Sequence, residues 1–105
     1  MRLRIGYAGT RVEITPDSRL RFRELTTHRK ATEFVVSVIN LGLTQIDATT
    51  RPRGGVGKQR ASVWVEVSES LLARAKESAK LSGMSFSDWF RTALELRFER
   101  ELQSS

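Results

Sequence analysis

Residues 62–67, Ser-Val-Trp-Val-Glu-Val, decide the fold that this sequence predicts. Apolar and polar side chains alternate strictly along them, which is typical of a short strand with one buried face. The three valines share one face, and the other face carries Ser62, Trp64 and Glu66. A lone strand with open edges is not stable, so we expect a second strand of the chain to pair with this one.

Two helices are predicted after this strand. Ser68 followed by Glu69 is a good helix start, and apolar residues then recur at helical spacing. Gly83 is typical of a helix end, and Ser85-Phe86-Ser87-Asp88 is a capping box that opens a second helix reaching to about Leu102. Residues 61–102 therefore predict the order strand, helix, turn, helix.

The same order is predicted for residues 10–42. Residues 11–15 match residues 64–68 at an offset of 53, with Val12 and Ile14 facing inward. Thr15 is then the helix N-cap, and Pro16 sits at the first helical position, where its missing N–H costs nothing. After the turn the offset is 55, so that residues 32–39 align with 87–94. We interpret the chain as a degenerate tandem repeat.

Residues 43–60 separate the two copies. Within them, residues 51–60 hold three Gly, one Pro and four cations, a composition that favours a flexible basic linker. At ~3.3 Å per residue this linker is long enough for the two copies to pair within one chain. We therefore expect one domain over residues 1–105, of the α+β class and mainly helical. Its two copies share a two-stranded antiparallel ribbon and a four-helix core.

Composition excludes several classes of site. The chain of 105 residues has no Cys, which excludes disulfides and thiolate zinc sites. His28 is the only His, so we expect no metal, and no cofactor or enzyme motif has supporting context. Gly-Val-Gly-Lys at 55–58 lacks the residues that a phosphate-binding loop requires. No stretch is apolar enough for a membrane span or a signal peptide, so we expect a cytoplasmic protein.

The second copy resembles the ribbon-helix-helix (MetJ/Arc/CopG) superfamily of DNA-binding proteins. The resemblance rests on the alternating valines, on Leu71-Leu72-x-x-Ala75-Lys76-x-x-Ala79, on Gly83-Met84-Ser85-Phe86-Ser87 and on Trp89. Members are usually intertwined homodimers. Two copies in one chain are similar to the single-chain pseudodimers among accessory proteins of conjugative relaxosomes and of T-DNA transfer.

This resemblance implies double-stranded DNA as the partner, with the ribbon in the major groove. The ribbon residues facing DNA would be Arg11, Glu13, Ser62, Trp64 and Glu66, with Arg11 opposite Trp64 as a cation–π neighbour. Phosphates would be held by backbone N–H groups at the start of the second helix of each copy, at Lys30, Thr32, Ser85, Phe86 and Ser87. The role would be transcriptional regulation or DNA processing of the conjugation type, by a monomeric pseudodimer that associates on DNA.

Charge adds to this hypothesis. The chain has 18 Lys and Arg against 12 Asp and Glu, a net charge of +6, and 14 of its cations are Arg. Arg binds phosphate bidentately, although an Arg-rich composition also arises from a GC-rich genome. Residues 61–105 carry a net charge of −1, so the positive charge lies in the first copy and the linker. We therefore expect the linker cations Arg51, Arg53, Lys58 and Arg60 to contact phosphates.

Two alternatives stay open at this point. The ribbon presents two Glu and a Trp, which favours a protein-interaction module of the antitoxin or inhibitor kind that does not read bases. Trp64 would then contact a protein, or it would pack on the N-terminal segment. In that segment, residues 1–7 either add a strand, with Ala8-Gly9 as a tight turn, or form a basic arm.

Overall fold

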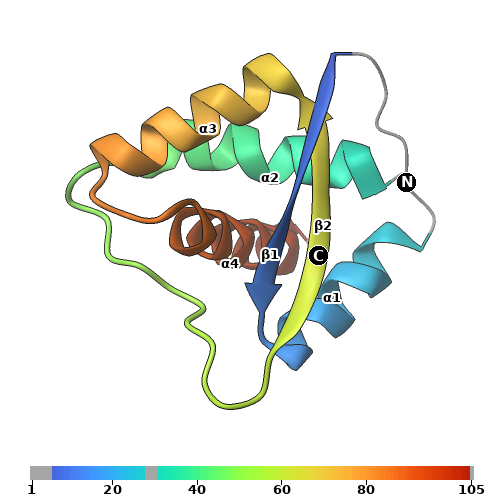
Figure 1. Cartoon of the computed structure of the whole chain (residues 1–105). Coiled ribbons are helices and arrows are strands. Elements are labelled where there is room, and N and C mark those ends of the chain that lie inside the picture. The colour runs from blue at the N-terminus through green and yellow to red at the C-terminus, as the bar shows by residue number, and fades with distance from the viewer. Residues whose placement is uncertain (1–5, 28–30, 105) are drawn as a thin grey trace.

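The structure is a computed structural model that describes residues 6–27 and 31–104. Figure 1 shows the order of its elements, in which strand, helix, helix occurs twice. The first three elements are β1 (Tyr7–Ile14), α1 (Pro16–Thr26) and α2 (Ala31–Gln45). The second three are β2 (Ala61–Ser68), α3 (Glu69–Leu81) and α4 (Phe86–Ser104). The fold thus contains four helices and a two-stranded antiparallel sheet.

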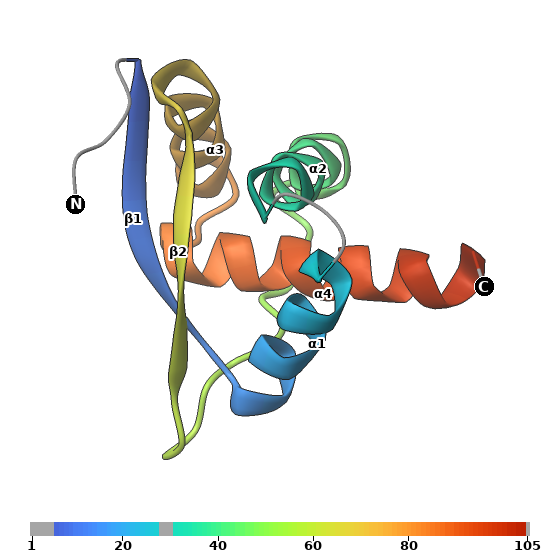
Figure 2. The ribbon, with the colours of Figure 1, turned by 90° about the vertical axis from the view of Figure 1, so that its right-hand side faces the viewer.

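The two strands form a ribbon that lies on one side of the molecule, with the helices behind it (Figure 2). Its inner face includes five side chains that are at most 7% exposed, namely Val12, Ile14, Val63, Val65 and Val67. The register pairs Arg11 with Trp64 and Val12 with Val63. Both the alternation and this register are as predicted, because only one register buries the apolar face of both strands.

β1 is longer than the sequence analysis predicts. It begins at Tyr7, so that Ala8 and Gly9 lie inside the strand and do not form a tight turn. β2 runs on to Ser68, and its last residues need antiparallel partners for their backbone groups. Tyr7 to Thr10 supply them, and beyond the strand the Glu69 N–H donates to the Gly6 carbonyl at 2.9 Å. Residues 1–5 of the expected strand or arm lie outside the described residues.

The predicted helix caps are confirmed. The Thr15 side chain accepts from the Ser18 N–H at 3.1 Å, and Ser68 accepts from the Leu71 N–H at 3.3 Å. Ser85 accepts from the Asp88 N–H at 3.1 Å where α4 begins. Gly83 has a φ of +73°, the left-handed conformation that ends α3 and that other residues rarely adopt. The Thr15 and Ser68 caps fix where α1 and α3 leave the ribbon, and Gly83 and Ser85 fix the turn from α3 to α4.

The core lies between the ribbon, α2 and α4. Four of the pairs that the repeat aligns are buried in both copies: Phe34 and Trp89, Val35 and Phe90, Val38 and Ala93, Ile39 and Leu94. The Trp89 indole N–H donates to Ser78 on α3 at 3.0 Å. Gly42 on α2 lies against the Trp89 ring, where a Cβ would come within 2.8 Å of the ring carbons. A side chain at this position would therefore push α2 away from α4.

The segment expected as a flexible linker is shorter and more attached than predicted. Leu43 to Gln45 belong to α2, and the Ile46 N–H continues the helical hydrogen bonding by donating to the Gly42 carbonyl. The Ile46 side chain is only 5% exposed. Further along, the Arg53 N–H donates to the fully buried Thr92 side chain at 2.9 Å. The Arg53 guanidinium also forms an ion pair with Glu99. Part of the connection is therefore docked on α4.

Candidate nucleic-acid interface

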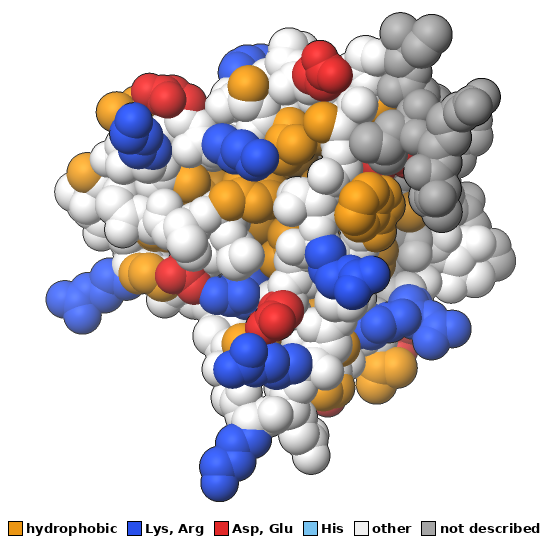
Figure 3. All heavy atoms as spheres, in the orientation of Figure 1, with side chains coloured by type: hydrophobic (Ala, Val, Ile, Leu, Met, Phe, Trp, Pro, Cys, Tyr) orange, Lys and Arg blue, Asp and Glu red, His pale blue; other side chains and the backbone are white. Residues whose placement is uncertain are grey.

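The outer face of the ribbon carries all five residues that the sequence analysis assigns to it. Arg11, Glu13 and Trp64 are exposed, and Ser62 and Glu66 are half-buried. They alternate with the buried residues of β1 and β2, so their side chains leave the ribbon on the side away from the helices. Figure 3 shows this face, where Lys and Arg side chains gather mainly over the lower half.

Trp64 lies over Gly9. A Cβ at Gly9 would be 2.2 Å from one carbon of the indole and 2.7 Å from another, so the ring occupies the space that a side chain would fill. The side chain remains 47% exposed. Although the register places Arg11 opposite, the described side chains show no cation–π contact between Arg11 and Trp64. The expected register of Arg11 opposite Trp64 is therefore confirmed, but the expected cation–π contact is wrong, because the ring lies over Gly9.

Arginines hold one end of the ribbon, where Glu13 pairs with Ser62. Arg19 of α1 donates to the Ser62 carbonyl at 3.1 Å, and Arg91 of α4 donates to the Glu13 carbonyl at 2.9 Å. The Glu13 carboxylate forms an ion pair of 3.0 Å with Arg60. With Arg11 beside them, these side chains make what we call the arginine end of the ribbon. Its exposed cations are Arg11, Arg19 and Arg60.

Arg91 stabilises the arginine end of the ribbon from inside the protein and is not available to a ligand. Its side chain is 11% exposed and forms an ion pair with Asp88, and its Nε is buried without a hydrogen-bond partner. The sequence alone indicates a solvated helix face for Arg19, with DNA contact as the alternative, and it assigns no role to Arg91. The available signal was weak: Arg19 occupies the position that the repeat aligns with the buried Leu72, so a cation there breaks the apolar pattern of the helix.

The two helix starts expected to bind phosphate already have acidic neighbours. Asp88 lies in the first turn of α4 and Glu33 in the first turn of α2. An acidic side chain there occupies the positive end of the helix dipole and repels a further anion. Phe86 is half-buried and stacks on Trp89 with ring centroids 6.2 Å apart, so its side chain belongs to the core.

The other expected phosphate residues at these starts differ in exposure. Ser85 is exposed and caps α4, whereas Ser87 and Thr32 are half-buried. Lys30 and His28 lie outside the described residues. In Figure 2, α4 begins close to the ribbon and runs away from it.

Two of the four linker cations form ion pairs in the structure. Arg60 pairs with Glu13 on the ribbon, and Arg53 pairs with Glu99 on α4. The Arg53 hydrogen bond lowers the pKa of the Glu99 carboxyl below its ordinary value, and the same bond raises the pKa of Arg53. Arg51 and Lys58 are exposed. Of the four, only Arg60 makes a described contact with the ribbon.

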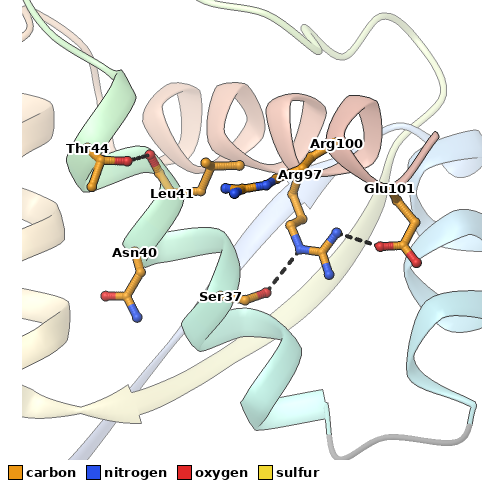
Figure 4. A pocket seen from close by; sticks show the side chains of 7 residues that line it. All are labelled: Ser37, Asn40, Leu41, Thr44, Arg97, Arg100 and Glu101. Atoms are coloured by element: carbon orange, nitrogen blue, oxygen red, sulfur yellow. Dashed lines mark hydrogen bonds and ion pairs between the residues drawn. The ribbon is translucent and has the colours of Figure 1, made fainter. Parts of the chain in front are cut away.

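A second polar region lies between α2 and α4, on the side away from the ribbon (Figure 4). It is an open hollow of about 520 Å³ between Ser37, Asn40 and Thr44 of α2 and Arg97 and Arg100 of α4. Arg97 donates to Ser37 at 3.2 Å and to Glu101 at 2.7 Å, and its guanidinium lies 5.2 Å from the centre of the Phe34 ring. The charge of Arg97 is thus already compensated within the protein.

Two kinds of site are not found in the described part of the chain. No three His, Cys, Asp or Glu side chains there are grouped in a way that could hold a metal ion. No helix within residues 6–27 and 31–104 is long and apolar enough to cross a membrane.

Comparison with known proteins gives no relatives. No protein-family model, curated protein or solved structure matches this chain. The functional argument therefore depends on the residues and on their arrangement.

Proposed function

We propose that this chain is a DNA-binding protein that places its two-stranded ribbon in the major groove. In this proposal the two strand-helix-helix units are ribbon-helix-helix copies joined in one chain as a pseudodimer. The major groove of B-DNA is wide enough to accept a two-stranded ribbon, and this ribbon projects on the side of the molecule away from all four helices (Figure 2). The biological role would be regulation of transcription or assistance in DNA processing.

The observation that carries the proposal is the arginine end of the ribbon. Three exposed arginines, contributed by β1, α1 and the linker, meet there beside the outward face. Guanidinium groups bind phosphate oxygens bidentately, and phosphate contacts supply most of the affinity of such proteins for DNA. An antiparallel ribbon flanked by cations has the shape and the charge that a groove between two phosphate backbones requires.

The acidic side chains of the ribbon are the main objection to this proposal, and the contact of Glu13 reduces its weight. Because Glu13 already pairs with Arg60 at 3.0 Å, its charge is compensated before any DNA approaches. Arg60 can contact a phosphate while it still pairs with Glu13, because a guanidinium has five N–H donors and only one of them is used in the described hydrogen bonds. Glu66 is half-buried near the other end of the ribbon.

The test is a titration of labelled duplex DNA at several salt concentrations, followed by fluorescence anisotropy. Affinity should fall as salt rises, and Arg60→Gln should weaken binding while reducing the slope of log K against log salt by about 1. Arg100→Gln removes the same charge from the part of α4 that points away from the ribbon and is the matched control (Figure 2). If the wild-type chain fails to bind duplex DNA at low salt, the proposal is wrong.

The pseudodimer arrangement has its own test. Sedimentation equilibrium should give the mass of one chain, 11.9 kDa. Urea unfolding of the same sample should be cooperative, which shows that the single chain is folded. An obligate dimer would mean that β1 and β2 pair between chains and would contradict the arrangement. The same measurement with duplex DNA present would count the protein molecules on each duplex.

A second candidate function is favoured by the exposed Trp64 between two glutamates. Aromatic side chains with large exposed areas are common at protein interfaces, so the ribbon would instead dock a protein partner. Nuclease treatment before a pull-down distinguishes the two functions. A stoichiometric partner that survives nuclease and is lost in Trp64→Ala would favour this candidate over DNA binding.

A further inference from the structure

Trp64 lies in the middle of the outward ribbon face, and much of its indole ring is exposed to solvent. The ring lies against Gly9 and has no aromatic or cationic partner among the described residues. It is 47% exposed, whereas Trp89 is fully buried. The half-exposed indole therefore offers a ligand a large apolar surface together with one polar N–H.

A ring in this position is poorly suited to read paired bases. Reading the edges of base pairs in the groove requires hydrogen-bonding side chains that stand out from the ribbon, and indole has one N–H donor and no acceptor. A ring held against the ribbon instead presents π surface. That surface fits the flat face of a nucleobase, which is accessible once the base has left its stack.

The cations near Trp64 fit a nucleic acid as the occupant, and of the two nearby glutamates Glu13 is paired with Arg60 while Glu66 lies opposite Gly9. Arg11 is its direct cross-strand neighbour, and the other exposed cations of the arginine end, Arg19 and Arg60, contact the adjacent Glu13 and Ser62 pair. An aromatic side chain beside cations is the combination that proteins use to hold single-stranded nucleic acid: the cations hold the phosphates and the ring stacks on the base.

We propose that Trp64 is a stacking site for an unpaired nucleobase, so that the ribbon binds DNA containing a single-stranded stretch more tightly than fully paired DNA. This inference rests on the proposed function, because it names the form of DNA that the same ribbon face prefers. Gly9 is part of the site as a positioning residue. Any side chain at Gly9 would displace the ring, since a Cβ there would lie 2.2 Å from it.

The experiment compares three labelled DNA probes of equal length and charge. One is a paired duplex, the second has a central gap with unpaired thymines, and the third has abasic residues in place of those thymines. The gapped probe should bind about tenfold more tightly than the other two, a difference of about 1.4 kcal/mol. Intrinsic fluorescence reports the contact, because quenching by the gapped probe must come from the exposed Trp64 and not from buried Trp89.

Variants separate stacking from charge. Trp64→Leu should remove the preference, so that the gapped probe and the paired duplex bind this variant with equal affinity, whereas Trp64→Phe should keep most of the preference. Gly9→Val retains the indole and should reduce the preference by displacing it. Circular dichroism and urea unfolding check that each variant is folded.

The outcomes distinguish this inference from the proposed function. Equal binding of all three probes, or a preference that survives Trp64→Leu, overturns the stacking site and leaves the DNA-binding proposal standing. Tighter binding to the abasic gap than to the paired duplex would also overturn it, because flexibility of the probe would then explain the preference. Failure to bind any probe at low salt overturns both.

Discussion

Trp64 and Trp89 both lie against a glycine, one on the outer face of the ribbon and one in the core between α2 and α4. Gly9 leaves room for the first indole and Gly42 for the second, with hypothetical Cβ distances of 2.2 Å and 2.8 Å. The surroundings are opposite. Trp89 is fully buried with its N–H bonded to Ser78, whereas Trp64 is 47% exposed. A ring that lies against a glycine therefore packs two helices together in the core, whereas on the ribbon it stays exposed to solvent.

The difference predicts different consequences for the same substitution. Inside, a void or a clash is transmitted to both helices, because packed interiors have little free volume. Outside, the ring can move into solvent and the ribbon keeps its hydrogen bonds. Stability should therefore depend on Trp89 and Gly42, and the surface properties of the ribbon on Trp64 and Gly9.

The largest effect is expected for Trp89→Ala. Removing this ring leaves a cavity between α2 and α4 and leaves Ser78 without its indole partner. We expect a loss of about 3–5 kcal/mol in the free energy of unfolding, measured by urea denaturation. Trp64→Ala is the comparison, and its loss should stay below about 1 kcal/mol. Equal losses for the two would contradict the division between core and surface.

A matched pair of glycine substitutions sharpens the comparison. Gly42→Ala places a methyl group within 2.8 Å of the Trp89 ring and 3.0 Å of Ala93, which we expect to cost about 1–3 kcal/mol. Gly9→Ala meets only the exposed Trp64 ring, which can move, so its effect on unfolding should be within about 0.5 kcal/mol. The same urea titration measures both. A larger cost at Gly9 would show that Trp64 is held rigidly.

The smallest effect is expected for an exposed contact on α4, the ion pair of Arg53 and Glu99. Its hydrogen bond lowers the pKa of Glu99, so the pair stabilises the folded chain above the ordinary carboxyl value of 4.5. That stabilisation is lost as the pH falls through the lowered folded pKa. Wild type should therefore be slightly more stable than Glu99→Gln at pH 7, and urea midpoints of the two should converge in acid. A gap that widens in acid would contradict this assignment.

Much of the fold could be predicted because a few residues constrain it strongly. The alternation in both strands, together with the Thr15, Ser68 and Ser85 caps, places the ribbon and three of the four helices. The register followed from these, since a shift by one residue would expose every buried valine.

The parts that were missed depend on long-range contacts. Ala8-Gly9 has the composition of a turn, but β2 pairs with it and Trp64 covers the glycine. The linker has the composition of a flexible segment, but the buried Thr92 accepts its Arg53 N–H. Local composition carries no information about either partner.

The sequence predicted that the five ribbon residues face outward, and it did not predict the contacts around them. All five ribbon residues face outward, but the arginines that hold the ribbon end come from α1 and α4, distant in sequence. The aligned repeat obscured Arg19, because its counterpart Leu72 is buried in the other copy.

The joining of both strands in one chain has a consequence for recognition. A ribbon made by two identical chains presents each residue twice and matches a palindrome. Here Arg11 and Glu13 of β1 lie beside Trp64 and Ser62 of β2, so the two directions along the ribbon differ chemically. If the proposed function is correct, a DNA site complementary to this surface needs no inverted repeat, and the protein bound to it has one defined polarity.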